Sequence, residues 1–222
     1  PAVKAAPRSA YRDAVAHLEE ALAALARLPE TDDRLAHAID LRLALRSSLF
    51  PLGQITRDLD NLKEAEILAL RLGDRRRLGW ILAYMIRDFS ILGMPDQSIE
   101  QGQRALALVP EVGDLELEML INGYLGSVCF ARGDYRQAVD LLGKGVEVLR
   151  DGLELRRFGL PGPASVFFRL WLISSLTRLG RFDEAEVQSQ EGLRVARQAE
   201  QPPAVMVAQY AAGFQPPPRP VL

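Results

Sequence analysis

The chain has 222 residues, of which 48% are hydrophobic and 25% are charged, as in an ordinary folded protein. Its formal net charge of −2 excludes a general electrostatic attraction to nucleic acid or to an anionic membrane. The single cysteine, Cys129, excludes an internal disulfide and fits the reducing cytoplasm, where we expect the protein to be located.

The first residues show no periodic pattern, and we expect residues 1–8 to be a disordered lead-in. Apolar residues at helical spacing then predict a helix over residues 9–29, which has the pattern of a repeat's second half. We interpret the chain as a fragment of a longer protein, because it opens with proline instead of methionine. No stretch has the ~18 to 20 apolar residues of a membrane span, and no secretory signal opens the chain.

Four helical hairpins are predicted next, over residues 33–73, 74–110, 114–150 and 164–199. Each hairpin has one glycine at its turn, and these turn glycines are Gly53, Gly93, Gly133 and Gly180. Their spacing of 40, 40 and 47 residues indicates an internal repeat of about 40 residues. An irregular loop over residues 151–163 accounts for the longer last interval.

Small residues recur at fixed distances from the turn glycine. In the third hairpin, Gly126 stands seven residues before Gly133, Ala138 five residues after it, and Gly145 twelve residues after it. Small side chains at these positions predict that the two helices of a hairpin cross closely. The first hairpin departs from the pattern, with Arg46 and Asp58 in the first two positions.

A partial repeat is predicted over residues 203–213, followed by a proline-rich tail over residues 214–222 that cannot continue a helix. This last unit lacks a second helix. We expect its apolar face to be exposed or covered by a neighbour, which makes it a candidate surface for self-association. That face comprises Val205, Val207, Ala208 and Ala211.

The hairpins resemble tetratricopeptide repeats (TPRs), and the third unit fits best through Leu125-Gly126, Gly133, Ala138 and Gly145. The resemblance implies an all-α fold, namely a single right-handed superhelical α-solenoid of TPR-like hairpins over residues 9–213. The repeats of about 40 residues are longer than the usual 34, as in the kinesin-light-chain and bacterial-regulator varieties.

A narrower similarity is carried by residues 9–22, 40–53, 102–108 and 157–162. These runs are similar to the C-terminal repeats of large bacterial proteins that carry a class III adenylate or guanylate cyclase domain and a signalling ATPase domain. The preference for arginine over lysine also suggests a bacterial source. The cyclase and ATPase motifs are absent from these 222 residues, so neither activity is assigned to them.

No pattern of catalytic or metal-binding residues is recognised, and we expect no cofactor, no metal and no enzymatic activity. The two histidines, His17 and His37, lack the companions of a zinc site. Cys129 lies on the packing seam, which favours a small buried residue over a reactive thiol. The short basic run at residues 75–77 is interpreted as solvated charge and not as a phosphate-binding patch. Four polar residues resemble a calcium loop only loosely and are interpreted as a solvated helix face: Asp58, Asp60, Asn61 and Glu64.

The first helix of each hairpin lines the concave side of a stacked array. On these helices we predict a binding face that is rich in aromatic residues, a type that dominates binding hot spots. Its members are Phe50, Trp80, Tyr84, Arg87, Tyr124, Ser127, Phe130, Phe167, Trp171, Ser174 and Tyr210. The alternative is that several of them simply pack between neighbouring hairpins.

The leading functional hypothesis is a non-catalytic signalling module that binds a peptide, a protein or a domain of its own chain on the concave face. One alternative is a small-molecule sensor, in which Trp80, Tyr84, Arg87, Tyr124 and Trp171 enclose a ligand. Another is the repeat segment of a transcriptional regulator. Nucleic acid and membrane are not expected as partners of these residues.

Overall fold

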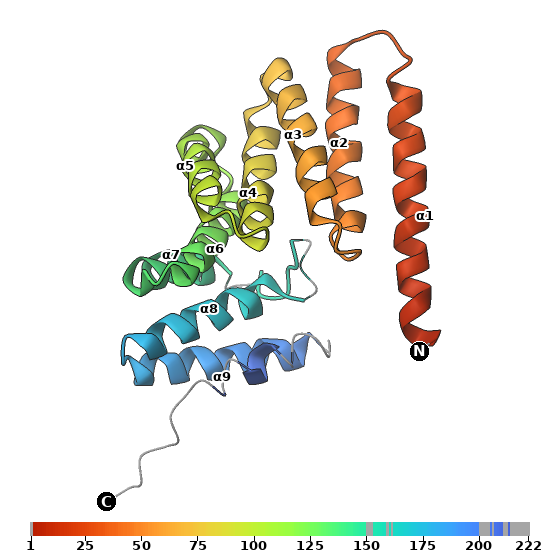
Figure 1. The fold of residues 1–222 in the computed structure, drawn as a ribbon. Coiled ribbons are helices and arrows are strands. Elements are labelled where there is room, and N and C mark those ends of the chain that lie inside the picture. Colours follow the sequence, from red (N-terminus) through yellow and green to blue (C-terminus); the bar gives the residue numbers. More distant parts are fainter. Residues whose placement is uncertain are drawn as a thin grey trace, which may run out of the picture. The chain divides into compact units, whose positions relative to one another are not determined.

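The computed structural model describes residues 2–149, 153–158, 160, 162–199, 205, 207–210 and 213, with only the backbone of residues 2–7. The regular structure of these residues is entirely helical, which confirms the predicted all-α fold (Figure 1). The nine helices assigned among them are α1 (Ala2–Leu25), α2 (Asp32–Leu49), α3 (Ile55–Leu72), α4 (Arg75–Ile91), α5 (Pro95–Val112), α6 (Leu115–Ala131), α7 (Tyr135–Val148), α8 (Ala164–Arg178) and α9 (Phe182–Gln198).

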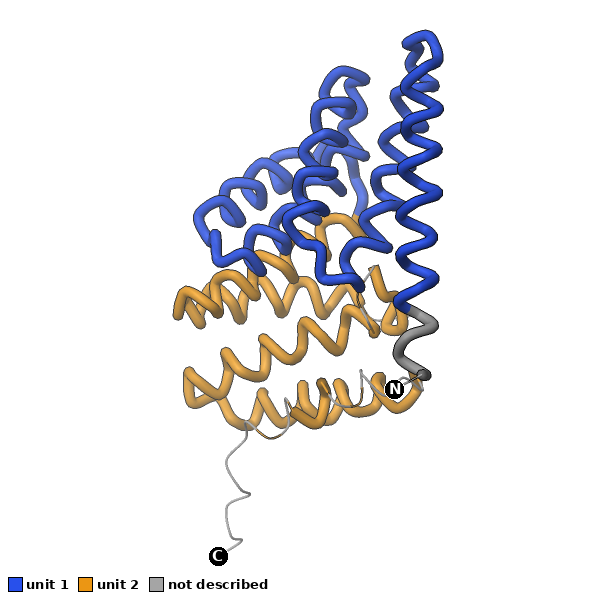
Figure 2. The backbone as a smooth tube through the Cα atoms, turned by 45° about the vertical axis from the view of Figure 1, so that its right-hand side comes forward, with its two compact units in different colours: residues 1–114 blue, residues 115–222 orange. Residues whose placement is uncertain are grey.

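The chain divides into two compact units, residues 1–114 and residues 115–222 (Figure 2). Unit 1 contains α1 to α5, and unit 2 contains α6 to α9. Within each unit every helix packs on the next one along the chain, and α6 also contacts α8. The boundary falls between the second and third predicted hairpins, so each unit contains two hairpins, with α1 added in unit 1 and the final partial repeat in unit 2.

The four predicted turns share one geometry. Their glycines have φ between +73° and +84°, a region that an L side chain disfavours. In each turn the residue after the glycine donates its backbone N–H to the carbonyl five residues earlier, as Asp134 donates to Cys129 at 2.9 Å. The last carbonyl groups of the first helix therefore accept hydrogen bonds from backbone N–H groups of the turn, which is the Schellman arrangement. The next helix then begins, with Asp134 accepting a hydrogen bond from the Gln137 amide at 3.2 Å.

The small-residue positions are close helix crossings, as predicted. A Cβ placed on Gly126 of α6 would lie 2.5 Å from Cγ of Leu142 on α7. In the second hairpin the Ser98 hydroxyl donates to the Ile86 carbonyl at 3.0 Å. The two helices of a hairpin thus approach until a side chain of one contacts the backbone of the other.

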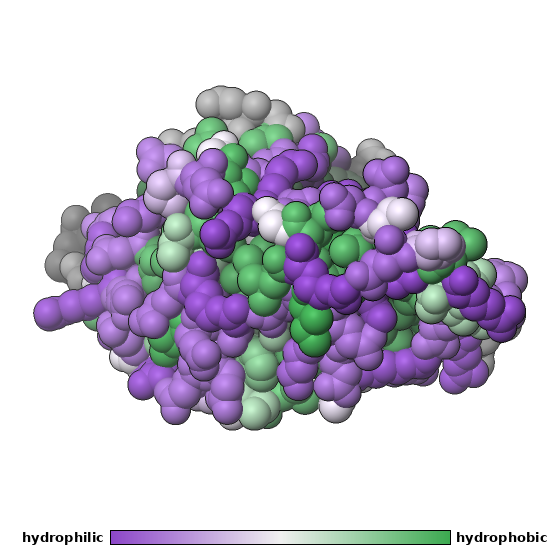
Figure 3. Space-filling model, turned by 90° about the horizontal axis from the view of Figure 1, so that it is seen from above, coloured by the Kyte–Doolittle hydropathy of each residue, from purple (hydrophilic) through white to green (hydrophobic). Residues whose placement is uncertain are grey.

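Charged side chains link the helices at the surface. In the basic run, Arg77 of α4 pairs with Asp40 of α2 at 2.8 Å, and Arg75 lies 3.8 Å from Glu111. Hydrophilic side chains dominate the face seen from above, with hydrophobic ones showing between them (Figure 3). Among the residues that the structure describes, no helix has the length and apolar character to cross a membrane.

Two predicted boundaries are wrong. Residues 2–8 are not a disordered lead-in, since α1 begins at Ala2 in an alanine-rich stretch with high helix propensity. The second hairpin does not close at Pro110, because α5 continues to Val112. Gly113 ends it with φ +63° and an amide hydrogen bond to the Val109 carbonyl at 2.9 Å.

The final partial repeat covers an apolar surface of unit 2. Val205, Val207 and Ala208 pack against a buried cluster formed by α8 and α9, whose members are Val166, Val195 and Ala196. The predicted face is therefore covered by its own neighbour over these residues, while Ala211 lies outside the described residues.

We predict that Gly133→Ala lowers the free energy of unfolding by about 1 to 2 kcal/mol, because alanine disfavours φ near +84°. Gly143→Ala is the matched control. It lies inside α7, where an added Cβ would meet no atom within 4 Å, and alanine should raise stability by about 0.5 to 1 kcal/mol. Urea unfolding of both variants measures the two effects. Equal stability of Gly133→Ala and wild type would contradict the role given to the turn.

Candidate functional site

The first hairpin replaces its small-residue contact by an ion pair. Arg46 of α2 and Asp58 of α3 occupy the two positions at which other hairpins have small or uncharged residues, and they face each other with Nε and Oδ2 4.0 Å apart. Both side chains are buried. Opposite charges at two facing positions of one hairpin were the signal in the sequence that could have revealed this pair.

A second pair from α4 completes the cluster. Arg87 lies 3.6 Å from Asp58, and it donates to Asp88 from Nη2 at 2.8 Å and from Nε at 3.1 Å. We call Arg46, Asp58, Arg87 and Asp88 the arginine–aspartate cluster. Its four side chains are only 0% to 6% exposed, although charged side chains are rarely buried to this degree unless paired. The cluster joins α2, α3 and α4.

The surroundings of Asp58 disfavour the charged form of its side chain. Burial and the neighbouring Asp88 raise its pKa to about 8, against the opposing effect of Arg46 and Arg87. A raised pKa at Asp58 favours the loss of one negative charge beside the two guanidinium groups.

Two aromatic rings cover this cluster, one at the α2–α3 turn and one on α4. The Arg87 guanidinium lies 3.7 Å from the ring centre of Phe50, and the Arg46 guanidinium lies 3.6 Å from that of Tyr84. Such cation–π contacts hold both partners in place. Trp80 continues the row, with its ring centre 5.8 Å from that of Tyr84.

We call Phe50, Trp80 and Tyr84 the aromatic row. All three rings are partly exposed. The Trp80 indole N–H donates to Asp114 at 3.2 Å, and Arg76 binds the same carboxylate at 3.0 Å. The row is therefore fixed at one end by a hydrogen bond and along its length by buried cations, which makes it a preorganised apolar surface.

Several other residues of the predicted binding face lie in unit 2. Phe130 of α6 stacks obliquely on Trp171 of α8 with ring centres 5.2 Å apart, and it also contacts Tyr135 at 5.6 Å. Phe167 and Ser127 are half-buried, and the Ser127 hydroxyl donates to the Tyr124 carbonyl at 2.6 Å.

Three predicted face residues are interior. Arg87 belongs to the arginine–aspartate cluster, and Tyr124 packs edge-on against Phe168 with ring centres 5.8 Å apart. Ser174 is buried and donates to the Leu170 carbonyl at 2.8 Å. Tyr210, in contrast, is 65% exposed.

The interpretation of Asp58, Asp60, Asn61 and Glu64 as one solvated face is wrong for two of them. Asp58 and Asn61 are buried, and Asn61 donates to the Arg42 carbonyl at 2.9 Å. Asp60 and Glu64 are exposed. Buried and exposed residues alternate along α3 because only one side of this helix packs against α2 and α4. No group of three or more histidine, cysteine, aspartate or glutamate side chains in the described ranges has the geometry of a metal site.

Cys129 is a buried residue of α6, as expected from its place on the packing seam. Burial raises the pKa of its thiol, with the Asp134 carboxylate adding to the effect. The thiolate form that would react with an electrophile is thereby disfavoured.

Comparison with solved structures identifies the fold. The chain matches a Rap protein in complex with a competence and sporulation factor, with a TM-score of 0.72 and 12% identity over 91% of this chain. It matches BtubC from P. vanneervenii (TM-score 0.67, 16% identity, 92% of this chain and 85% of that one). It also matches TPR-like repeats of a Podosopora anserina putative kinesin light chain (TM-score 0.60, 17% identity, 86% of this chain and 88% of that one).

The likeness establishes a TPR-like array of helical hairpins, as the repeat pattern predicts. The chain spans about half of the Rap structure, 54% of its length. No protein-family profile matches the sequence, and no curated protein matches it.

The raised pKa of Asp58 gives a prediction about stability. The folded protein holds a proton on Asp58 up to about pH 8, whereas an unfolded chain releases it near the ordinary value of 3.8. The contribution of Asp58 to stability is therefore complete below pH 4 and falls as the pH rises to 8. Asparagine is neutral at every pH, so Asp58→Asn does not lose stability in this way. The free energy of unfolding of the variant relative to wild type should therefore rise by up to about 1.4 kcal/mol per pH unit between pH 5 and 8.

Urea unfolding of both proteins at pH 5, 6.5 and 8 measures the difference. Asp60→Asn is the control, because Asp60 lies on the same helix, is exposed and pairs with Lys63 at 3.4 Å. Its stability relative to wild type should not change over this range. The same pH trend in both variants would contradict the assignment to the buried carboxyl.

Proposed function

We propose that this chain is a non-catalytic interaction module that binds a peptide segment of a protein on the aromatic row of unit 1. The observation that carries this proposal is the stacking of Phe50 and Tyr84 on buried guanidinium groups. Aromatic side chains that are already immobilised bind with little further loss of conformational entropy.

The chemistry of the row defines the class of ligand. Partly exposed rings offer apolar contact area to a ligand's aliphatic or aromatic side chains. The two guanidinium groups behind the Phe50 and Tyr84 rings favour a ligand with a carboxylate close to those side chains, either an acidic residue or a chain terminus. A short apolar peptide segment with one or two acidic residues satisfies both conditions.

The solved structures agree with such a role. The Rap structure of the same fold was determined in complex with a competence and sporulation factor, so a repeat array of this kind holds a second molecule. The small-molecule alternative is less well supported, because Arg87 and Tyr124 are buried and do not offer the enclosing surface that it requires. We also propose that this chain is a regulatory region of a bacterial cyclase/ATPase signalling protein that acts in the cytoplasm. The local similarity of the sequence supports this proposal.

A displayed peptide library, selected on the wild-type protein, tests the proposal. Peptides that bind should be enriched in apolar and acidic residues, and Tyr84→Ala should weaken them at least tenfold, because an aromatic anchor typically contributes about 2 kcal/mol or more. Fluorescence anisotropy of a labelled selected peptide measures the affinity.

Phe167→Ala in unit 2 is the matched control, since it also removes a half-buried ring from a first helix. It should bind the selected peptide as wild type does, and circular dichroism should show both variants to be helical. Peptides that bind Tyr84→Ala as tightly as wild type would exclude the aromatic row as the binding surface.

A further inference from the structure

The two carboxyl groups of the arginine–aspartate cluster differ in how they are bonded. Asp88 accepts two hydrogen bonds from Arg87, at 2.8 Å and 3.1 Å. The contacts of Asp58 are longer, since its Oδ2 lies 3.6 Å from Nη2 of Arg87 and 4.0 Å from Nε of Arg46. The Asp58 side chain is fully buried, yet neither of its oxygens accepts a hydrogen bond from the residues that the structure describes.

This geometry favours a proton on Asp58. A carboxylate that is removed from water and accepts no hydrogen bond has lost most of the interactions that stabilise its charge. Asp88 holds both charge-assisted hydrogen bonds and repels a second negative charge beside it. Both effects act in the direction of the raised pKa of Asp58, about 8. The cluster therefore contains one group that gains or loses a proton close to neutral pH.

This proton lies directly behind the aromatic row. The Cζ atom of Arg46 is 3.6 Å from the ring centre of Tyr84, and that of Arg87 is 3.7 Å from the ring centre of Phe50. Each of these guanidinium groups also lies within 4.0 Å of Asp58. Loss of the proton thus adds a negative charge beside the two cations on which the rings are stacked.

We propose that the binding of an acidic peptide on the aromatic row is linked to the proton on Asp58, so that the row binds the peptide more tightly when Asp58 is protonated than when it is ionised. This regulation rests on the proposed function, because it concerns the same surface and the same class of ligand. An ionised Asp58 attracts both guanidinium groups and repels the carboxylate of the ligand, whereas a protonated Asp58 leaves the two cations to attract that carboxylate.

The size of the effect follows from the layers between Asp58 and the ligand. A ring and a guanidinium group separate Asp58 from a carboxylate on the outer side of the row, which corresponds to roughly 8 to 10 Å. At this separation, with a dielectric between those of water and of a protein surface, repulsion of two like charges changes a dissociation constant by about threefold to tenfold.

The charged groups that face Asp58 come from the two helices packed against α3. These groups are Arg46 from α2 and both Arg87 and Asp88 from α4. Other charged side chains of these helices have partners away from the cluster: Arg42 of α2 pairs with Glu64, and Arg77 of α4 pairs with Asp40 and Asp74. Exposed carboxylates and arginines ordinarily keep their charge between pH 6 and pH 9.

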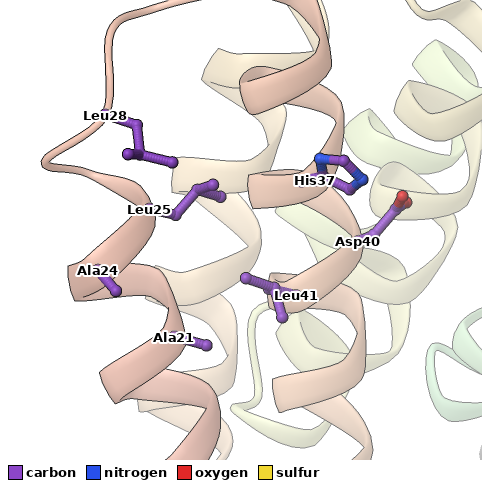
Figure 4. Close-up of a pocket in the computed structure, with 7 residues that line it drawn as sticks. All are labelled: Ala21, Ala24, Leu25, Leu28, His37, Asp40 and Leu41. Carbon is purple, nitrogen blue, oxygen red and sulfur yellow. The ribbon is translucent and has the colours of Figure 1, made fainter.

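His37 is the group whose titration must be distinguished from that of Asp58, because histidine ordinarily changes charge near neutral pH. It is exposed on α2, where it lines an open pocket between α1 and α2 together with Asp40 (Figure 4). It stands nine residues before Arg46, which corresponds to about 13 Å along a helix. A substitution at His37 should therefore leave the cluster and its proton unchanged.

The experiment measures fluorescence anisotropy of a rhodamine-labelled acidic peptide, selected on the wild-type protein and free of histidine, at pH 6, 7, 8 and 9. The acidic residues of the peptide are ionised throughout this range. We expect the dissociation constant to rise at least twofold from pH 6 to pH 9, because Asp58 loses its proton over this range. A peptide in which amides replace every carboxyl group should bind equally at each pH.

Two variants assign the effect to a residue. Asp58→Asn should bind the acidic peptide with an affinity that does not change with pH, because asparagine has no proton to lose. His37→Gln is the control and should keep the pH dependence of wild type. Circular dichroism with urea unfolding checks that both variants are folded. A pH dependence that persists in folded Asp58→Asn, or disappears in His37→Gln, would overturn the proposal.

Calorimetry on the wild-type protein tests the same linkage without a substitution. Binding at pH 8 in phosphate and in Tris, buffers whose ionisation enthalpies differ, should show net uptake of a fraction of one proton per peptide. Absence of proton uptake, with an affinity that is constant from pH 6 to pH 9, would overturn the proton linkage. Tyr84→Ala shows whether the proposed function fails as well: weaker binding by this variant retains the aromatic row as the binding surface, and unchanged binding excludes both proposals.

Discussion

The close crossing of the two helices in each hairpin is the contact on which the structure depends. It requires a small residue at the point of contact, as with Gly126 against Leu142, and a turn that reverses the chain within a few residues. The turn glycines meet the second requirement through their positive φ. Because each hairpin buries its apolar face only against its neighbours, the same crossing must recur for the array to be stable.

The first hairpin meets this requirement by different chemistry, and the candidate site follows from the difference. Arg46 and Asp58 replace a small-residue contact, and burying them is costly unless every charge finds a partner. Arg87 and Asp88 provide those partners from the next hairpin, and Phe50 and Tyr84 cover the guanidinium groups. A requirement of folding thereby fixes two aromatic rings at a partly exposed surface, where they are available to a ligand.

Much of the fold was predictable because its signals are local. The glycine spacing gave all four turns, and the periodicity of apolar residues gave the hairpins around them. The lead-in over residues 2–8 and the end of α5 were missed, since helix propensity and the Gly113 cap outweighed the absence of a periodic pattern and the presence of Pro110. The burial of Asp58 and Asn61 was missed because it depends on contacts with α2 and α4, which no local pattern in α3 reports. The predicted face combined surface rings with interior residues such as Tyr124 for the same reason.

The central claim is that ligands bind the aromatic row, and the two tryptophans of the chain allow a direct test because one lies in each unit. A ¹H–¹⁵N NMR spectrum should contain two indole N–H signals, assigned by Trp80→Phe and Trp171→Phe. On titration with a peptide selected on the wild-type protein, the Trp80 signal should shift in proportion to occupancy while the Trp171 signal stays in place. A shift confined to Trp171, or saturation of binding without movement of the Trp80 signal, would contradict the account.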